Sequence, residues 1–178
     1  SLVELDLSGN LIRKIHRYMF SGLISLQKLF LSNNFIEEID LDAFGIELSK
    51  LNRIQLNHNR LRTLKDSQFY NLKSLEYIYL QYNYIESINS KIFNGLFKLS
   101  YVSLSLNNIK IIHIEKNSNI KIDFFNLRQN FLTSLENFTF TGLECKNLNL
   151  YSNRIDFIDK NAFEKLIDTE SLILDKNR

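Results

Sequence analysis

A pattern of about two dozen residues recurs along the whole of this 178-residue chain and constrains its fold more than any other feature. Each copy carries apolar residues spaced as LxxLxL, an asparagine three residues later, two further apolar positions, a phenylalanine and a closing leucine. Copies start near residues 2, 26, 51, 75, 99, 122 and 145, and a partial eighth starts at 169. One repeat cannot cover its own apolar edge, so neighbouring repeats must stack. The sequence therefore predicts one repeat domain over 1–178.

Each LxxLxL segment alternates apolar and other residues, which is typical of a β-strand with one buried face. An asparagine follows at the turn where the chain leaves the sheet. A buried amide there can bond backbone groups of its own turn and of the next one, so we favour a structural role over a polar binding track. The asparagines of this ladder are Asn10, Asn34, Asn59, Asn83, Asn107, Asn130, Asn153 and Asn177.

The phenylalanine column predicts an aromatic spine inside the solenoid. Repeat five breaks it, because Asn117 stands where phenylalanine is expected. Either Ile114 turns inward to fill the gap, which we favour, or Ile111 and Ile114 form an outward apolar patch. Two residues after the phenylalanine position comes a residue type that tolerates positive φ, which predicts a left-handed turn. The members of this turn column are Gly22, Asn71, Gly95, Asn119 and Gly142.

The repeat resembles the leucine-rich repeat family, and the match to LxxLxLxxNxLxxLxxxxFxxLxx covers essentially the whole chain. It is similar to the typical subclass found in Toll-like receptor and Slit-type ectodomains. The resemblance implies an α/β-type repeat solenoid, a horseshoe with a parallel β-sheet on its concave face and irregular or 3₁₀ segments on its convex side. Stacked repeats need polar caps, and neither end of the sequence resembles one, so we expect a fragment that lacks both caps.

No catalytic motif is present, and we expect no enzyme activity, no cofactor and no metal site. No Cys/His cluster has zinc spacing, and the single Cys145 occupies an apolar position that suits a buried small hydrophobe better than a nucleophile. The 22 basic and 20 acidic residues nearly balance, which argues against a nucleic-acid partner. No apolar run is long enough to span a membrane, so we expect no membrane contact by this segment.

Side chains between the strand leucines should point outward from the concave sheet. Aromatic residues gather on the middle strands, with arginines beside them, and this combination is typical of interface hot spots. The alternative is that tyrosine and phenylalanine simply stabilise a sheet face, although strand propensity alone would spread them over all repeats. The predicted partner-binding residues are Phe30, Arg53, Tyr77, Tyr79, Tyr82, Tyr101, Phe124 and Arg128.

These features predict a non-enzymatic recognition module that binds a protein ligand or co-receptor on the concave face, with its oligomeric state open. Asn137-Phe138-Thr139 matches the N-glycosylation acceptor motif, although chance explains a three-residue match equally well in an asparagine-rich chain. Together with the resemblance, the motif favours an extracellular or cell-surface receptor or adhesion protein. Two alternatives remain, a cytoplasmic scaffold and the docking arm of an enzyme whose catalytic domain lies outside this segment.

Overall fold

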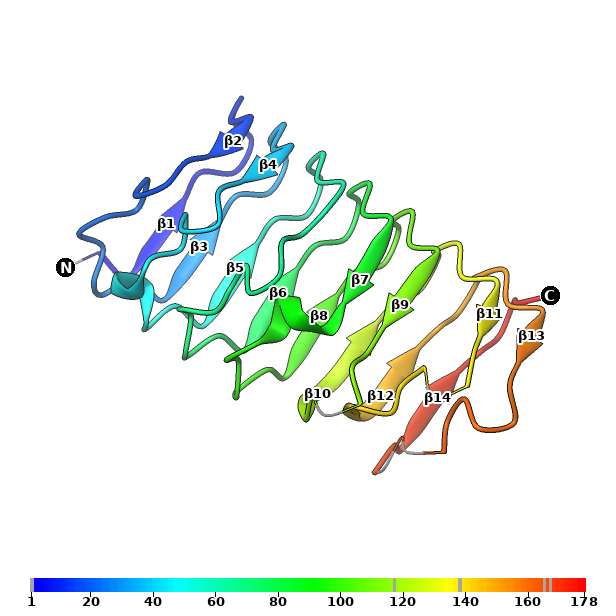
Figure 1. Cartoon of the computed structure of the whole chain (residues 1–178). Coiled ribbons are helices and arrows are strands. Elements are labelled where there is room, and N and C mark those ends of the chain that lie inside the picture. The colour runs from blue at the N-terminus through cyan, green and yellow to red at the C-terminus, as the bar shows by residue number, and fades with distance from the viewer. Residues whose placement is uncertain (1, 117, 138, 165, 167) are drawn as a thin grey trace.

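The computed structural model is a solenoid of stacked parallel strands, and it describes residues 2–116, 118–137, 139–164, 166 and 168–178. One eight-stranded parallel sheet runs the length of the molecule, with the termini at opposite ends (Figure 1). Consecutive strands of this sheet are neighbours, so the chain advances by one strand per repeat. The predicted repeat solenoid is confirmed. The strands are β1 (Glu4–Asp6), β3 (Lys28–Phe30), β5 (Arg53–Gln55), β6 (Tyr77–Tyr79), β8 (Tyr101–Ser103), β10 (Ile120–Asn126), β12 (Leu143–Asn149) and β14 (Ser171–Ile173).

Short strands and 3₁₀ helices form the second layer of the solenoid, and no α-helix occurs in the described ranges. The 3₁₀ helices η1 (Ile46–Leu48) and η2 (Ser90–Phe93) agree with the predicted convex segments. Three two-stranded parallel sheets were not predicted, because strands of two or three residues carry no periodicity of their own. They pair β2 (Lys14–Ile15) with β4 (Glu38–Ile39), β7 (Ser87–Asn89) with β9 (Ile111–His113), and β11 (Ser134–Leu135) with β13 (Phe157–Ile158).

The core lies between the two layers. Leu29, Ile54, Ile78 and Val102 pair in register on four adjacent strands, and all four are fully buried. Burial of such side chains stabilises a fold by about 1.5–3 kcal/mol each. Because every interior strand buries its leucines between two neighbours, stacking the repeats is what forms the core.

The phenylalanine spine stacks in its first part, where the Phe44 ring lies 6.2 Å from Phe20 and 5.7 Å from Phe69. It resumes near the other end, where the Phe140 and Phe163 rings lie 6.1 Å apart.

Repeat five is built as the favoured interpretation predicts, although Asn117 itself lies outside the described residues. Ile114 is 6% exposed and belongs to the core, whereas Ile111 is 64% exposed, so the alternative of a shared outward patch is wrong. The Phe93 ring, which has no phenylalanine of repeat five beside it, instead meets Phe125 edge-on at 6.1 Å.

The asparagine ladder joins consecutive turns. Asn83 Nδ2 donates to the carbonyl oxygens of Leu80 at 3.0 Å and Leu56 at 2.9 Å, and its Oδ1 accepts from the backbone N–H of Leu61 at 3.0 Å. Leu56 and Leu61 belong to the preceding repeat, so the prediction that the amide bonds its own turn and the next one has the wrong direction. The amide points back toward the N-terminal neighbour, and Asn107 of the following repeat does the same for this turn.

The residue before each ladder asparagine adopts a left-handed conformation that we did not predict. Its φ lies between 54° and 69° in every repeat. A non-glycine residue in this region is uncommon, so seven side chains in one column show that the turn imposes the conformation. The column comprises Gly9, Asn33, His58, Tyr82, Leu106, Gln129, Ser152 and Lys176.

The turn column that was predicted is only partly correct. Gly22, Gly95 and Asn119 have positive φ, but Asn71 and Gly142 do not. Asn71 instead donates its side-chain amide to the Phe44 carbonyl at 3.2 Å. Position 142 requires glycine for a different reason, because a Cβ there would overlap the Glu115 carbonyl oxygen and the Ser118 hydroxyl of the neighbouring turn.

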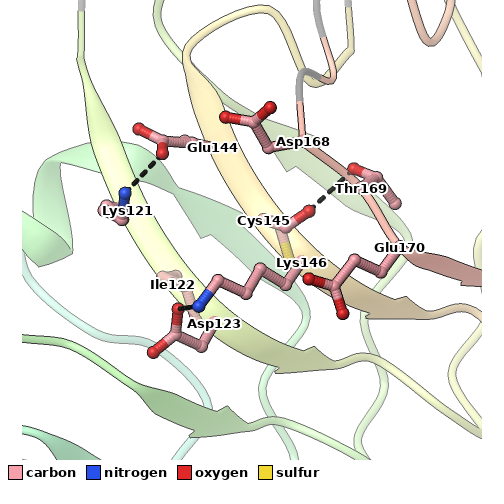
Figure 2. A pocket seen from close by; sticks show the side chains of 9 residues that line it. All are labelled: Lys121, Ile122, Asp123, Glu144, Cys145, Lys146, Asp168, Thr169 and Glu170. Atoms are coloured by element: carbon pink, nitrogen blue, oxygen red, sulfur yellow. Dashed lines mark hydrogen bonds and ion pairs between the residues drawn. The ribbon is translucent and has the colours of Figure 1, made fainter.

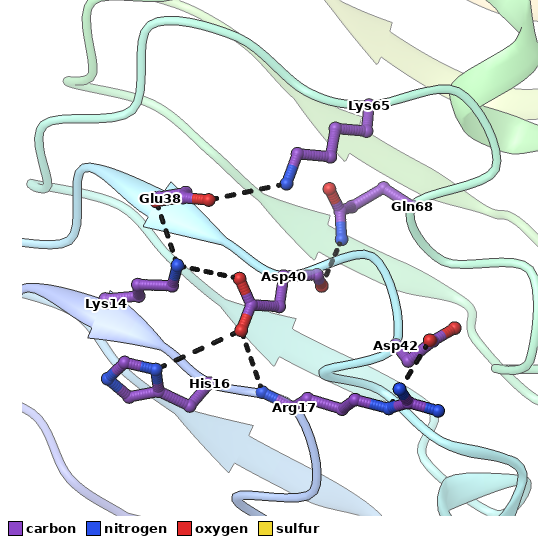
Figure 3. Close-up of polar contacts among 8 residues, drawn as sticks. All are labelled: Lys14, His16, Arg17, Glu38, Asp40, Asp42, Lys65 and Gln68. Carbon is purple, nitrogen blue, oxygen red and sulfur yellow. Dashed lines mark hydrogen bonds and ion pairs between the residues drawn. The ribbon is translucent and has the colours of Figure 1, made fainter.

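Charged side chains connect the first three turns on the second layer (Figure 3). Lys14 Nζ lies 3.0 Å from Glu38 and 2.9 Å from Asp40, and Lys65 Nζ lies 3.5 Å from the other oxygen of Glu38. Hydrogen bonds from Lys14 and from the backbone N–H of Arg17 hold the pKa of Asp40 below its usual range. Exposed pairs of this kind contribute little individually, so they supplement the core and the ladder.

Candidate recognition surfaces

The outward side chains of the eight-stranded sheet form two rows, which together we call the sheet face. Neighbours within a row are about 4.8 Å apart, the ordinary spacing of paired strands. The first row is Glu4, Lys28, Arg53, Tyr77, Tyr101, Phe124, Asn147 and Ser171. The second row is Asp6, Phe30, Gln55, Tyr79, Ser103, Asn126, Asn149 and Ile173.

Four rings in the middle of the sheet face form an aromatic cluster, defined here as Tyr77, Tyr79, Tyr101 and Phe124. The Tyr101 ring lies 5.2 Å from Tyr79 and 5.3 Å from Phe124, the latter nearly parallel at 8°. The guanidinium of Arg53 covers the Tyr77 ring at 4.7 Å from its centroid. All four rings are half-buried, and this burial raises the pKa of the Tyr79 hydroxyl. The cluster is thus an ordered apolar surface that still meets solvent.

Two other predicted residues lie near the aromatic cluster but outside it. Phe30 is two strands from Tyr79, with Gln55 between them. Arg128, just beyond β10, packs its guanidinium over the Tyr151 ring at 5.0 Å. These residues border the cluster rather than extend it.

The middle of the two outward rows carries no acidic residue. Lys28 Nζ pairs with Glu4 at 3.0 Å near the N-terminal end. Neither row carries an acidic residue between the strand of Arg53 and the strand of Phe124. Within the described part of the chain, no carboxylate pairs with Arg53 or Arg128, so both guanidinium groups can meet a partner.

Tyr82, the remaining predicted residue, belongs to a different surface. Its ring stacks on His58 at 4.2 Å, at the edge where the chain leaves the sheet strands. Both residues line a groove of about 590 Å³ that crosses repeats two to six. We call this the edge groove.

Two columns, one on each side of the ladder asparagines, line the edge groove, and no described lining residue carries a carboxylate. The sequence pattern does not reveal the groove, because the residue types of each column are irregular. The available signal was the aromatic residue directly after the asparagine in repeats two, four and six. The column before the asparagines contributes His58, Tyr82, Leu106 and Gln129, and the column after them contributes Phe35, Arg60, Tyr84, Asn108 and Phe131.

A depression of about 440 Å³ lies at the opposite, N-terminal end of strands β10 and β12 (Figure 2). Its lysines already have partners, because Lys121 pairs with Glu144 at 2.5 Å and Lys146 pairs with Asp123 at 3.1 Å. Cys145 lies among these residues, and burial raises the pKa of its thiol to about 11. A thiol that stays protonated at neutral pH is a poor nucleophile, and Cys145 is 1% exposed, which agrees with its interpretation as a buried small hydrophobe.

The described residues were also compared with the requirements of a metal site and of a membrane span. No group of three or more His, Cys, Asp and Glu side chains among them is placed to hold a metal ion. None of the helices in the described ranges is long and apolar enough to cross a membrane. Asn137 is exposed, whereas Phe138 of the predicted glycosylation motif lies outside the described residues.

Known protein families match most of the chain. The family described as leucine rich repeat matches residues 1–45 and 49–109. A second family, described as BspA type leucine rich repeat region, matches residues 116–178. The change from one to the other falls at repeat five, where the spine loses its phenylalanine and the longer strands β10 and β12 follow.

Two curated proteins are similar over nearly the whole chain. Tsukushi of Gallus gallus is 34% identical, and the alignment covers 93% of this chain and 38% of Tsukushi. Toll-like receptor 3 of Boselaphus tragocamelus is 32% identical, over 98% of this chain and 21% of the receptor. The chain therefore spans between about a fifth and two fifths of the length of these relatives.

Solved structures share the fold. The TLR13–ssRNA13 complex superposes with a TM-score of 0.83 at 29% identity, covering 98% of this chain and 25% of that chain. The LRIM1/APL1C complex gives a TM-score of 0.76 at 25% identity, covering 99% and 31%. Because the first is a complex with an RNA, the exclusion of nucleic acid that we drew from balanced charge is not supported.

Proposed function

The chain belongs to the leucine-rich repeat family, and from this premise we propose that it is a non-enzymatic recognition module of a receptor or adhesion protein, binding a protein partner on the sheet face. The observation that carries the proposal is the aromatic cluster. Its half-exposed rings lie on paired strands, with Arg53 at one side, and the two outward rows carry no acidic residue between the strands of Arg53 and Phe124. Ordered aromatic rings with arginine beside them dominate the binding energy of many protein interfaces.

A stabilising role for the rings is the competing interpretation. Cross-strand aromatic pairs contribute roughly 0.2–1 kcal/mol each to a sheet. The buried leucines beneath the same strands contribute more, so the sheet does not need these rings in order to form. Their concentration on three adjacent strands, β6, β8 and β10, favours recognition, since a stabilising role would act equally well on any strand.

A protein partner fits the charges of the sheet face better than a nucleic acid does. Binding to a polyanion depends on several unpaired cations, each neutralising a phosphate. Within the two rows, Lys28 is already paired with Glu4, which leaves Arg53 as the basic residue without a carboxylate partner among the described residues. Arg128, just beyond β10, is the second guanidinium beside the rings. Two separated guanidinium groups beside apolar rings suit carboxylates at the rim of a protein interface.

An extracellular or cell-surface location forms part of the proposal. Similarity to a Toll-like receptor and the exposure of Asn137 support it. Secretion of the chain from mammalian cells should yield a glycan that a peptide N-glycosidase removes, and Asn137→Gln should abolish that mass difference. An unmodified Asn137 in the secreted chain would favour the cytoplasmic scaffold.

The test of the binding surface uses a display library of extracellular protein domains as the probe. Domains selected on the wild-type chain would be measured against the double variant Tyr79→Ala/Tyr101→Ala and against Tyr70→Ala, which removes an exposed ring from a turn outside the sheet face. Loss of two hot-spot rings should weaken binding by a factor on the order of 100 or more, while Tyr70→Ala binds like the wild type. Far-UV circular dichroism and melting temperature should change little.

Three results would contradict the proposal. Binders that tolerate the double variant would place the partner elsewhere. A melting temperature many degrees lower would make the rings structural. Binding of a single-stranded RNA probe that depends on the same rings, with no protein binder found, would assign the sheet face to nucleic acid.

A further inference from the structure

We propose that the edge groove is a docking site for a proline-rich polypeptide segment in the polyproline II conformation, supplied by another protein. This surface is distinct from the sheet face, and the inference does not depend on the function proposed for that face. Spacing, hydrogen-bonding capacity and charge carry it.

The aromatic rings of the groove recur at the period of a polyproline II helix. Phe35, Tyr84 and Phe131 occupy the position after the ladder asparagine in repeats two, four and six. Their backbone N–H groups donate to the corresponding carbonyl of the preceding repeat at 2.9, 2.9 and 2.8 Å, so the three positions are equivalent. At about 4.8 Å per strand, alternate repeats place the rings about 9.6 Å apart. A polyproline II helix advances about 9.3 Å per three-residue turn, so successive turns can meet successive rings.

The side chains between these rings create two unequal slots. Arg60 fills the first, where its guanidinium covers the Phe35 ring at 4.6 Å. Asn108, between Tyr84 and Phe131, is shorter than Arg60, so we expect the second slot to be more open, and Leu106 also lines the groove. Flat apolar slots between aromatic rings are the sites in which proline rings pack in known polyproline recognition.

The hydrogen-bonding capacity of the groove complements the same ligand. A proline-rich segment offers backbone carbonyls as acceptors, has few N–H donors and makes no internal hydrogen bonds. The lining supplies donors from Arg60, from the hydroxyls of Tyr82 and Tyr84, and from the side-chain amides of Asn108 and Gln129. The acceptor-only carboxylate, which such a ligand cannot satisfy, is absent from the described lining.

The charge of the groove lining favours a proline-rich segment over a polyanion such as a nucleic acid. Arg60 is the permanently charged residue of the described lining, and it lies 3.6 Å from Glu37 outside the groove. A polyanion needs more unpaired cations than this. The partial negative charge of a row of carbonyl oxygens matches one guanidinium and several neutral donors. The His58–Tyr82 stack orders this wall of the groove, so the protein loses little entropy on binding. A polyproline II segment is itself preformed, so the ligand also loses little.

The experiment is a titration of the ¹⁵N-labelled chain with decaproline, followed by two-dimensional amide NMR, with a glycine–serine decapeptide as the control. Decaproline should produce saturable shifts at the amides of residues 82–84, 106–108 and 129–131, and the glycine–serine peptide should not. Tyr84→Ala should weaken the affinity at least tenfold. Phe97→Ala, which removes an 83% exposed ring ahead of strand β8, should leave the affinity unchanged.

A second variant fills the open slot without removing a ring. Asn108→Arg introduces the residue that the same column already carries at Arg60 and Arg154, so the turn should accept it, and decaproline should bind at least tenfold more weakly. The inference is overturned if decaproline causes no saturable shift at these amides, or if Asn108→Arg binds it as well as the wild type does. Equal binding of the glycine–serine peptide, or tighter ring-dependent binding of oligouridine, would also overturn it.

Discussion

Asn83→Ala should lower the free energy of unfolding by about 2–3 kcal/mol, because it removes the amide that joins turns three and four. The side chain is 5% exposed and makes three hydrogen bonds to backbone groups, so alanine leaves those groups with fewer partners and no nearby solvent.

The three backbone groups are not equally affected. The Leu56 carbonyl also accepts from Asn59 at 3.0 Å, and the Leu80 carbonyl also accepts from Asn107 at 3.0 Å, so both keep one donor. The Leu61 N–H donates to Asn83 Oδ1 and has no second acceptor among the hydrogen bonds of the described residues. An unsatisfied buried donor costs about 1–3 kcal/mol, and the weakened carbonyls add a smaller amount.

The matched control is Asn10→Ala, at the first position of the ladder. Asn10 is exposed, and its Nδ2 donates to the carbonyls of Leu7 and Ser8 at 2.9 and 3.3 Å. The Leu7 carbonyl also accepts from Asn34, and no described N–H depends on the Asn10 oxygen. We therefore expect Asn10→Ala to cost less than about 1 kcal/mol.

Urea unfolding followed by circular dichroism measures both variants against the wild type. An unchanged m value shows that the unfolding transition remains comparable, so the shift in midpoint converts directly to free energy. Equal midpoints for Asn83→Ala and the wild type, or equal losses for Asn83→Ala and Asn10→Ala, would refute the argument that the orphaned Leu61 donor sets the magnitude.

Three further predictions concern single positions. Gly9→Ala should destabilise the fold by about 1 kcal/mol, because alanine disfavours the φ of +69° even though its methyl group would meet open space, whereas Gly45→Ala, at φ −66°, should be neutral or stabilising by up to about 1 kcal/mol. Urea midpoints compare the two variants, and a change of the same sign in both would contradict the backbone argument. Cys145 should resist a thiol-reactive disulfide reagent at pH 8 in the folded chain and react rapidly in urea, because burial raises its pKa to about 11; rapid reaction of the native chain would contradict this. Tyr82→Asn should raise the urea midpoint, since asparagine tolerates left-handed φ, and it should weaken decaproline binding, since it removes a ring of the edge groove. A lower urea midpoint would show that the tyrosine ring stabilises the turn.

The sequence predicts the sheet face in detail because two regularities act together. Alternation within each strand decides which side chains point outward, and the repeat length decides which of them become neighbours. The row Tyr77, Tyr101 and Phe124 follows from these two rules, and the observed pairing has that register. The two rules do not describe side-chain direction beyond the strand ends. For this reason Tyr82 was grouped with the residues of the concave sheet, whereas it lines the edge groove.

The left-handed column illustrates a second limit. Gly9 and Asn33 are residue types that suggest positive φ, but Tyr82, Leu106 and Gln129 are not, so the pattern disappears along the chain. The conformation is imposed by the ladder, whose hydrogen bonds hold the turn around each asparagine whatever residue precedes it. Repeat five was easier to interpret, because a missing phenylalanine leaves a volume that an adjacent isoleucine, Ile114, can occupy.

The edge groove is lined by large side chains at positions where the backbone is left-handed. A non-glycine residue in the left-handed region carries a penalty of roughly 1–2 kcal/mol, which asparagine largely avoids. Asn33 stands in this column just ahead of the groove, whereas the groove itself is lined from the same column by His58, Tyr82, Leu106 and Gln129. Ser152 and Lys176 adopt the same conformation outside the groove, so the backbone strain alone does not distinguish the groove, whereas the bulk of the side chains that accept it there does. Asparagine would give a more stable turn at these positions, so the presence of large side chains there favours a role in binding. For the same reason Tyr82→Asn should raise the stability of the fold and lower the affinity for decaproline.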